Sequence, residues 1–188
     1  MEEASWLKVT LCMPESSIIS GFTYIHDDER LLDILNGVVT RRVDSRSKSL
    51  EMVDVEISKP DGQEESRPTS YINKPAISLA ATWEKNGGRG YFAKTRYKEY
   101  PFVEKLKVPV HVQLSAFSLI GNMYLGPGQM ASHLLEEQAE FLPMTNVKVQ
   151  PLLNKLWSDI AFLAVNRRHV LSLEQEDVPL LKVMHGRG

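Results

Sequence analysis

Apolar and polar residues alternate along several short stretches of the chain, with the period of two that is typical of half-buried β-strands. The stretches Lys8–Leu11 and His111–Leu114 show this alternation, as do 52–57 and 144–149. Including less regular apolar runs, the predicted strands are 8–11, 17–24, 52–57, 77–80, 111–114, 144–149, 161–165 and 169–173. The pattern therefore predicts a mainly β protein.

Helical periodicity is limited to two short segments. The apolar stripe at 31–35 follows Asp27 and Asp28, which suit a helix N-cap, and ends at Asn36-Gly37. A second stripe at 130–135 follows Pro127, which suits a first helical turn. Helices of about two or three turns are unstable alone, so we expect both to pack against strands.

The features of the first half recur in the same order in the second half. Aligned without gaps, the recurring positions are Gly21 with Gly121, Tyr24 with Tyr124, Ile25 with Leu125, Ile34 with Leu134 and Leu35 with Leu135. Further on, 50–57 matches 142–149 and 77–81 matches 161–165. This serial order predicts an internal duplication. The alternative is two unrelated β-rich halves that share only the common succession of strands and turns.

Gly21 lies inside the predicted strand 17–24, and the alignment places Gly121 at the equivalent position of the second copy. A glycine there costs stability, so it usually marks a bulge, a sharp bend or the close approach of another backbone. The predicted fold is therefore mainly β (α+β), with two tandem small bent sheets or barrels. Each is β-β-α-β-β with one short helix over its open end, and one more strand can follow.

The boundaries of these units follow from composition. The predicted segments are a first β-rich repeat at 1–85, a basic aromatic connector at 86–108, a second β-rich repeat at 109–174 and a tail at 175–188. Turn formers and charges dominate 58–70, with nothing apolar to bury, so this segment is predicted to be a mobile loop between two strands.

Composition and charge narrow the function classes. The 188 residues are 43% hydrophobic and 24% charged, which is ordinary for a globular protein. The formal net charge is −2, so no strong overall field draws the protein to phosphate backbones or anionic lipid. Cys12 is the single cysteine, which excludes an intrachain disulfide. The acidic N-terminus does not resemble a signal peptide and no apolar run approaches a membrane span, so we expect a cytoplasmic protein.

Candidate chemistry is sparse. The acids after His26 are better explained as a helix N-terminus than as metal ligands, and the histidines lack the spacing of a zinc hydrolase. Gly87-Gly88-Arg89-Gly90 lacks the Lys-Ser or Lys-Thr of a phosphate-binding loop. We therefore predict no catalytic residue, no metal ligand and no cofactor.

Two segments carry candidate binding residues. In the connector, cations alternate with rings that could stack on bases: Arg89, Tyr91, Lys94, Arg96, Tyr97 and Lys98. The other interpretation is that the connector's aromatic residues seal a joint between two barrels. In the tail, the apolar residues Leu180, Leu181, Val183 and Met184 are predicted to bind a partner by strand addition to a sheet edge, or to pack on their own barrel.

Three motifs suggest a family. The helix motif is Arg30-Leu31-x-Asp33-x-Leu35-Asn36, and the strand motifs are Phe141–Val147 and Val165-Asn166-Arg167. Together they resemble an uncharacterised bacterial domain, present here in two diverged copies. The resemblance implies a fold and a bacterial origin, and no mechanism. Neither copy holds the full pattern, because the second helix carries Ser132, His133 and Glu136 and the first copy lacks the phenylalanine.

These observations favour an interaction protein: a non-catalytic scaffold or accessory subunit of a bacterial assembly, with a protein partner or self-association and without a membrane span. The alternative is a module for single-stranded nucleic acid, because the strand order is similar to that of Sm-like and SH3-like small barrels. A third interpretation is an enzyme with a site between the repeats.

Overall fold

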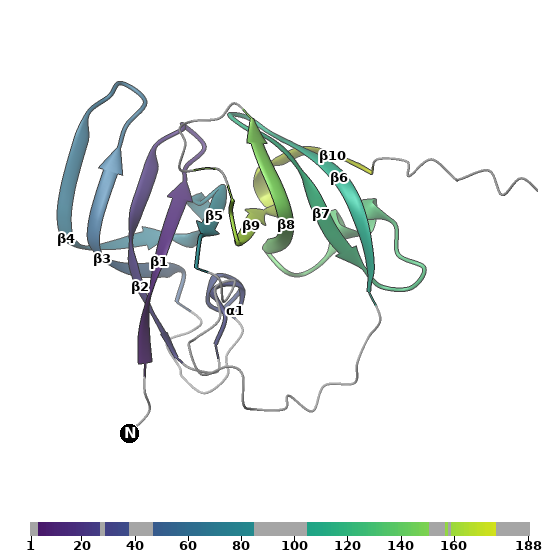
Figure 1. Cartoon of the computed structure of the whole chain (residues 1–188), viewed down its shortest axis with the longest axis horizontal. Helices are drawn as coiled ribbons and strands as arrows, with labels where there is room; N and C mark the ends of the chain where they lie inside the picture. The colour runs from purple at the N-terminus through teal and green to yellow at the C-terminus, as the bar shows by residue number, and fades with distance from the viewer. Residues whose placement is uncertain are drawn as a thin grey trace, which may run out of the picture.

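The fold is that of a single, strongly bent antiparallel sheet. The computed structural model describes residues 4–26, 29–37, 47–84, 105–150, 157 and 159–175. Within these residues ten strands form one sheet (Figure 1). The predicted mainly β class is thereby confirmed. None of the described helices is long and apolar enough to cross a membrane.

The elements follow one another in two similar series. The first comprises β1 (Ala4–Cys12), β2 (Ile18–His26), α1 (Leu31–Leu35), β3 (Ser49–Ser58), β4 (Glu64–Asn73), the 3-10 turn η2 (Lys74–Ala76) and β5 (Leu79–Thr82). The second comprises β6 (Leu106–Leu114), β7 (Ser118–Leu125), the 3-10 helix η3 (Ala131–Glu136), β8 (Phe141–Gln150), β9 (Phe162–Asn166), the 3-10 turn η5 (Arg167–His169) and β10 (Val170–Gln175).

The sheet order is β10-β6-β7-β8-β9-β5-β1-β2-β3-β4. The last five strands thus run β10-β6-β7-β8-β9 and the first five β5-β1-β2-β3-β4. The two sets meet where β5 pairs antiparallel with β9, with Leu79 opposite Val165. In Figure 1 this pairing lies in the middle of the molecule, between the two bent sets.

The alignment of 77–81 with 161–165 does not correspond to the sheet. β5 pairs with β1, whereas β9 pairs with β8, and β5 and β9 pair with each other. In strand order the counterpart of β5 is β10, since each is the neighbour of the first strand of its set. The two aligned segments look alike because 77–81 and 163–165 are buried on both faces, which requires an apolar run in either place.

Each predicted glycine lies opposite a bulge in the facing strand. The β2–β3 register shifts at Gly21 and the β7–β8 register shifts at Gly121. On the opposing strands Asp54 and Asn146 have φ values of 50° and 53°. A Cβ on Gly21 would lie 2.9 Å from the carbonyl oxygen of Val53, so another backbone does approach closely. The prediction of a bulge with close backbone contact is confirmed.

Replacing Gly21 by alanine is therefore expected to destabilise the fold by about 1–3 kcal/mol, because the backbone of β3 must shift to admit the methyl group. Gly126→Ala is the matched control, since its Cβ would meet only the flexible side chain of Gln129 at 3.1 Å. Urea unfolding of both variants measures the difference. An equal loss at both positions would contradict the bulge argument.

Two hydrophobic cores share the central strands. The first core, on β1–β4 and α1, includes Leu11, Leu31 and Met52, and the second, on β6–β9, includes Val112, Met144 and Trp157. Along β5, Leu79 and Ala81 belong to the second core and Ala80 to the first. From the other side, Phe141 and Ala164 reach into the first core. Since both cores are built partly from the opposite strand set, the joint between the sets is itself hydrophobic core.

The predicted loop at 58–70 is wrong for its second part. Residues from Glu64 onward form β4, and the turn is limited to the hairpin end, where the Lys59 N–H donates to the Gln63 carbonyl. Among the described strands β4 pairs only with β3, so its residues need little apolar character to stay in the sheet. Of the predicted connector only residues 105–108 are described, and of the predicted tail only residue 175.

Candidate functional site

The predicted binding residues are not placed by the structure. The candidate nucleic-acid residues, from Arg89 to Lys98, and the candidate partner-binding residues, from Leu180 to Met184, all lie outside the described ranges. Both predictions therefore remain predictions. Within the described ranges no group of three or more His, Cys, Asp or Glu residues could hold a metal ion.

Cys12 is a core residue at the end of β1. Its side chain is fully buried and belongs to the second core. Burial raises the pKa of the Cys12 thiol to about 12, because the thiolate would lose its hydration. At neutral pH the side chain is a protonated, inert thiol.

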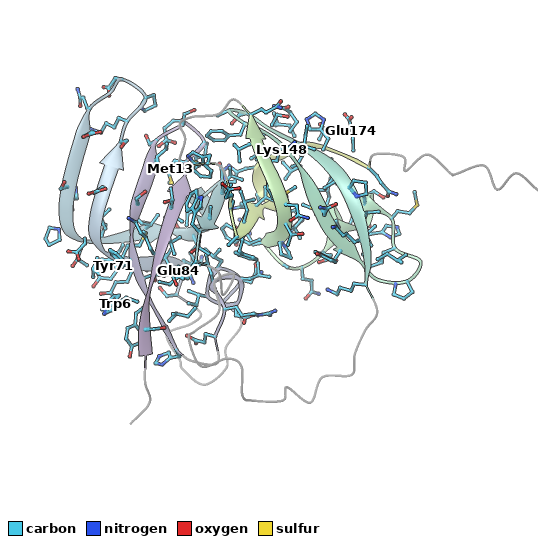
Figure 2. The ribbon with its side chains drawn as sticks, in the orientation of Figure 1. Trp6, Met13, Tyr71, Glu84, Lys148 and Glu174 are labelled. Atoms are coloured by element: carbon cyan, nitrogen blue, oxygen red, sulfur yellow. The ribbon has the colours of Figure 1, made fainter. Side chains whose placement is uncertain are left out.

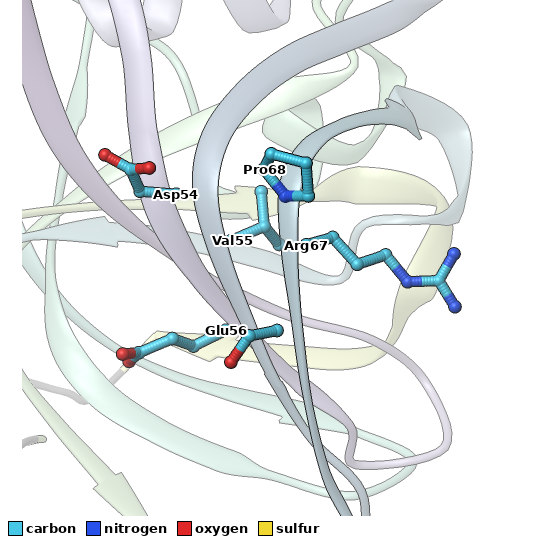
Figure 3. Close-up of a pocket in the computed structure, with 6 residues that line it drawn as sticks. Asp54, Val55, Glu56, Arg67 and Pro68 are labelled. Atoms are coloured by element: carbon cyan, nitrogen blue, oxygen red, sulfur yellow. The ribbon is translucent and has the colours of Figure 1, made fainter.

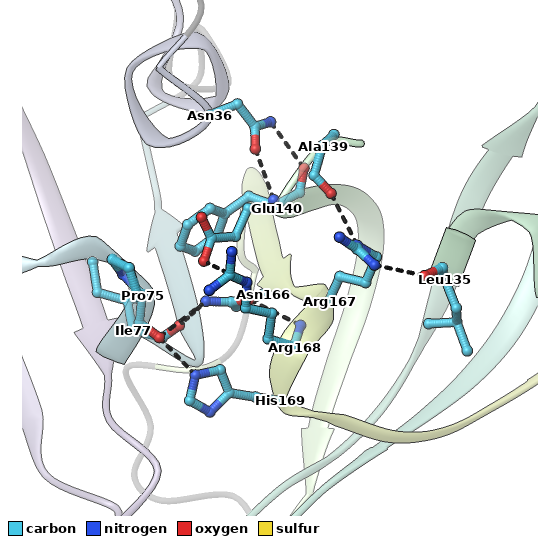
Figure 4. Close-up of polar contacts among 11 residues, drawn as sticks. Asn36, Pro75, Ile77, Leu135, Ala139, Glu140, Asn166, Arg167, Arg168 and His169 are labelled. Carbon is cyan, nitrogen blue, oxygen red and sulfur yellow. Dashed lines mark hydrogen bonds and ion pairs between the residues drawn. The ribbon is translucent and has the colours of Figure 1, made fainter. Parts of the chain in front are cut away.

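The richest polar cluster lies at the junction of the two strand sets (Figure 4). Asn36, directly after α1, clamps the backbone of Phe141 at the start of β8. Its Nδ2 donates to the Phe141 carbonyl at 3.0 Å, and its Oδ1 accepts from the Phe141 N–H at 2.7 Å. The Asn36 amide thereby joins α1 of the first strand set to the first residue of β8 in the second set.

A second amide, Asn166, closes the junction from the other side. Its side chain is fully buried, and its Nδ2 donates to the carbonyl of Ile77 at 2.9 Å. Its Oδ1 accepts from the N–H of Arg168 at 3.0 Å, which caps η5. His169 contacts the carbonyl of Pro75 through Nε2 at 2.8 Å. These bonds hold the turn before β10 against the turn before β5.

Cations anchor the short helices to these turns. Lys74 is buried, and its Nζ donates to the carbonyl of Ile34 in α1 at 2.6 Å. Burial lowers the pKa of Lys74, and the nearby Glu140 carboxylate partly opposes that shift. Arg167 donates from its guanidinium to the carbonyl of Leu135 in η3 at 2.8 Å. Both side chains use their hydrogen bonds to fix structure.

The helix motif has a local role as well. Arg30 donates from Nε to Asp33 at 2.8 Å and from its terminal nitrogen at 2.6 Å, a bidentate pair at the start of α1. Asp33 also accepts from the Arg30 N–H, as in a capping box. Arg30 and Asp33 thus start α1, at a spacing that is visible in the sequence, whereas Asn36, Asn166 and Arg167 hold the junction through partners that sequence spacing does not indicate.

A shallow depression of about 330 Å³ lies on the β3–β4 hairpin, lined by Asp54, Val55, Glu56, Ser66, Arg67 and Pro68 (Figure 3). The paired register skips the position where Pro68 would face Asp54, since proline has no N–H to donate. In Figure 3 the charged side chains of Glu56 and Arg67 point in opposite directions. The depression thus results from an interrupted ladder and offers no convergent polar groups.

Aromatic side chains are exposed on the first strand set. Trp6 is 54% exposed, Tyr24 44% and Tyr71 69%. The rings of Trp6 and Tyr24 meet edge to face, with centroids 5.5 Å apart. In Figure 2 Trp6 and Tyr71 lie at the same end of this strand set. Exposed tyrosine and tryptophan are the residues most enriched in protein interfaces.

The two outermost strands, β4 and β10, are the edges of the described sheet. The Lys74 N–H donates to the Lys48 carbonyl, and Ile72 lies opposite Leu50 in the same ladder. Because an antiparallel ladder alternates, the backbone groups of 69, 71 and 73 point away from β3. Strand β10 is shorter and has a register shift between Val170 and Ser172.

Sequence reasoning predicted the strand at 169–173 that corresponds to β10 but missed β4. The segment 64–73 shows no clear alternation, because its side chains are largely exposed on both faces and only Ile72 is buried. The available signal was the lack of charge in 69–73, which follows a charged stretch at 64–67.

In comparisons with known proteins, no family model matches the chain, and no curated protein or solved structure matches it at a significant level. The resemblance to an uncharacterised bacterial domain therefore remains a prediction from the three motifs.

Proposed function

We propose that the chain is a non-catalytic interaction protein, a scaffold or accessory subunit of a bacterial assembly, which contacts partners through its outer strands. The observation that carries this proposal is the open sheet of the described residues, which ends at β4 on one side and at β10 on the other. Unpaired backbone groups along an edge strand are ready to pair with a strand of another chain.

The proposal includes two tandem units. It is supported by the shared strand order, by the bulges at Gly21 and Gly121 and by the 3-10 turns that follow Asn73 and Asn166. Among the described strands, each of the two joined units leaves one outer strand, β4 in the first and β10 in the second. The chain is then suited to bridge other components.

An enzyme with a site between the units is less well supported. The polar side chains at the junction, among them Lys74, Asn166 and Arg167, donate to backbone carbonyls of neighbouring turns and helices. Groups used in this way hold the backbone together and are not directed at a common point where a substrate would lie.

The nucleic-acid alternative depends on the connector residues. On the described surface, Lys8 lies near the ring of Phe22, and its backbone N–H donates to the carboxylate of Glu84. Glu51 is exposed on β3, which pairs with the strand of Phe22. This mixture of charges gives little attraction to phosphate. Binding of a single-stranded oligonucleotide that weakens steeply with salt would reverse this preference.

Site-specific photo-crosslinking in the native cells tests the proposal. A photoreactive phenylalanine analogue replaces Tyr71 on β4 or Leu171 on β10, both 69% exposed. The matched control replaces Met130, which is 64% exposed but lies outside the strands. We expect a defined protein adduct from at least one edge position and none from Met130. No adduct from either edge, or equal adducts from all three positions, would contradict the proposal.

A further inference from the structure

The junction of the two strand sets shows how one edge of this molecule accepts a strand. The Asn166 N–H donates to the Ser78 carbonyl at 2.9 Å, so by alternation the backbone of Ala164 also faces β5. Leu79 and Ala81 of the added strand lie opposite Val165 and Leu163. All four side chains enter the second core.

Strand β4 occupies in the first set the place that β9 occupies in the second. Each pairs with the third strand of its set, and each ends at an asparagine that precedes a 3-10 turn. Matching Asn73 to Asn166 places Ile72 at the position of Val165 and Tyr71 at that of Ala164. Ile72 is 9% exposed and belongs to the first core, whereas Tyr71 is 69% exposed.

The two halves of β4 differ as edges. Residues 64–67 include Glu64, Glu65 and Arg67, and such charges discourage pairing with another strand. Residues 69–73 (Thr-Ser-Tyr-Ile-Asn) carry no charge and no proline. Their outward-facing N–H groups at 69, 71 and 73 are therefore competent to receive a strand.

We propose that residues 69–73 of β4 form an acceptor site for an extended, uncharged strand of another protein. The strand adds antiparallel to β4, and its apolar residues lie opposite Ser70 and Ile72. Ala81 and Leu79 of β5 lie in the same way opposite Leu163 and Val165 of β9. A small or apolar residue between them packs against the exposed ring of Tyr71. This inference deepens the proposed function and rests on it.

The strand β10 of a second copy fits this site poorly. The strand that corresponds to β5 is β10, since Leu11 pairs with Ala80 in the first set and Val112 pairs with Leu173 in the second. A copy of the internal junction would thus place Ser172 and Glu174 where β5 has Leu79 and Ala81. Burying the Glu174 carboxylate among apolar side chains is costly, so β10 does not extend the sheet between copies.

The test uses a peptide with the sequence of residues 77–83 (ISLAATW), followed by lysines for solubility, titrated into the full chain and followed by amide NMR. We expect saturable binding that shifts the amides of Thr69, Tyr71 and Asn73 and protects them from hydrogen exchange. A peptide with glutamate in place of Leu79 and Ala81 is expected not to bind, because its carboxylates would face the first core.

Variants at one position separate backbone from side-chain effects. Tyr71→Pro removes an outward N–H but leaves the β3–β4 ladder intact, since proline is tolerated on the open side of an edge strand. It is expected to weaken peptide binding at least about tenfold, whereas Tyr71→Ala retains the N–H and weakens it less. Thermal unfolding confirms that both variants are folded.

Several results would overturn this inference. The first is absence of peptide binding, or binding that shifts amides other than those of 69, 71 and 73. The second is undiminished peptide binding to folded Tyr71→Pro. The third is protection of the 69, 71 and 73 amides in the free monomer, which would mean that the chain covers its own edge. A concentration-dependent dimer that protects these amides would instead identify a second copy as the occupant. If the peptide fails while crosslinks persist at Leu171, the proposed function stands without this site.

Discussion

Replacing Asn166 by alanine is expected to lower the free energy of unfolding by about 3 kcal/mol, since unpaired buried polar groups cost about 1–3 kcal/mol each. The side chain is fully buried, and its Nδ2 donates to the carbonyl of Ile77 at 2.9 Å. Its removal leaves that carbonyl and the N–H of Arg168 without their partner inside the junction. Urea unfolding followed by far-UV circular dichroism measures the loss.

Asn122→Ala is the matched control for this variant. Its Nδ2 donates to the Thr145 carbonyl at the long distance of 3.5 Å, and the residue is half-buried. Water can replace the amide there, so the expected loss is below about 1 kcal/mol. Similar losses for Asn122→Ala and Asn166→Ala would show that the junction amide has no special structural role.

Replacing Leu79 by alanine is expected to destabilise the whole chain by about 2–5 kcal/mol, the usual cost of truncating a buried leucine. Leu79 is fully buried in the second core, although its strand pairs with β1 of the first set. The control Leu171→Ala truncates a side chain that is 69% exposed, and its expected effect is within about 0.5 kcal/mol.

The same experiment shows whether the two strand sets unfold together. Tryptophan fluorescence includes Trp157, which is buried in the second core and packs edge to face on Trp83 at 5.6 Å between ring centroids. Circular dichroism reports on the whole sheet. Because β5 and β9 supply side chains to both cores, we expect the two probes to give coincident transitions. Separate transitions would mean that the sets fold independently despite the shared strands.

Distant hydrogen-bond partners and solvent exposure explain why the candidate site was difficult to find in the sequence. Asn36, Asn166 and Arg167 stand in motifs that are visible along the chain, yet their hydrogen-bond partners lie far away in sequence. An amide that bonds a distant carbonyl has the same letter as one that faces water. The acceptor edge on β4 was missed because the side chains of this strand are mostly exposed, so no alternation of polar and apolar residues marks it.

The sequence by itself determined the local features of the fold. Alternation located β1, β3 and β8, because strands with one solvated face select polar and apolar residues in turn. The glycine within β2 predicted the bulge in the facing strand β3, since no other residue fits beneath the carbonyl of Val53 without a shift. These features depend on neighbours within one strand pair.

Only the tertiary structure decided how the two strand sets join. Along β5 every side chain is buried, and a continuous apolar run does not indicate which residues face which core or which strand lies alongside. Pairing with β9 follows from the position at which the two cores meet: Leu79 and Ala81 fill one, and Ala80 fills the other. That arrangement depends on contacts between residues far apart in the chain, and it leaves β4 and β10 as the outer strands.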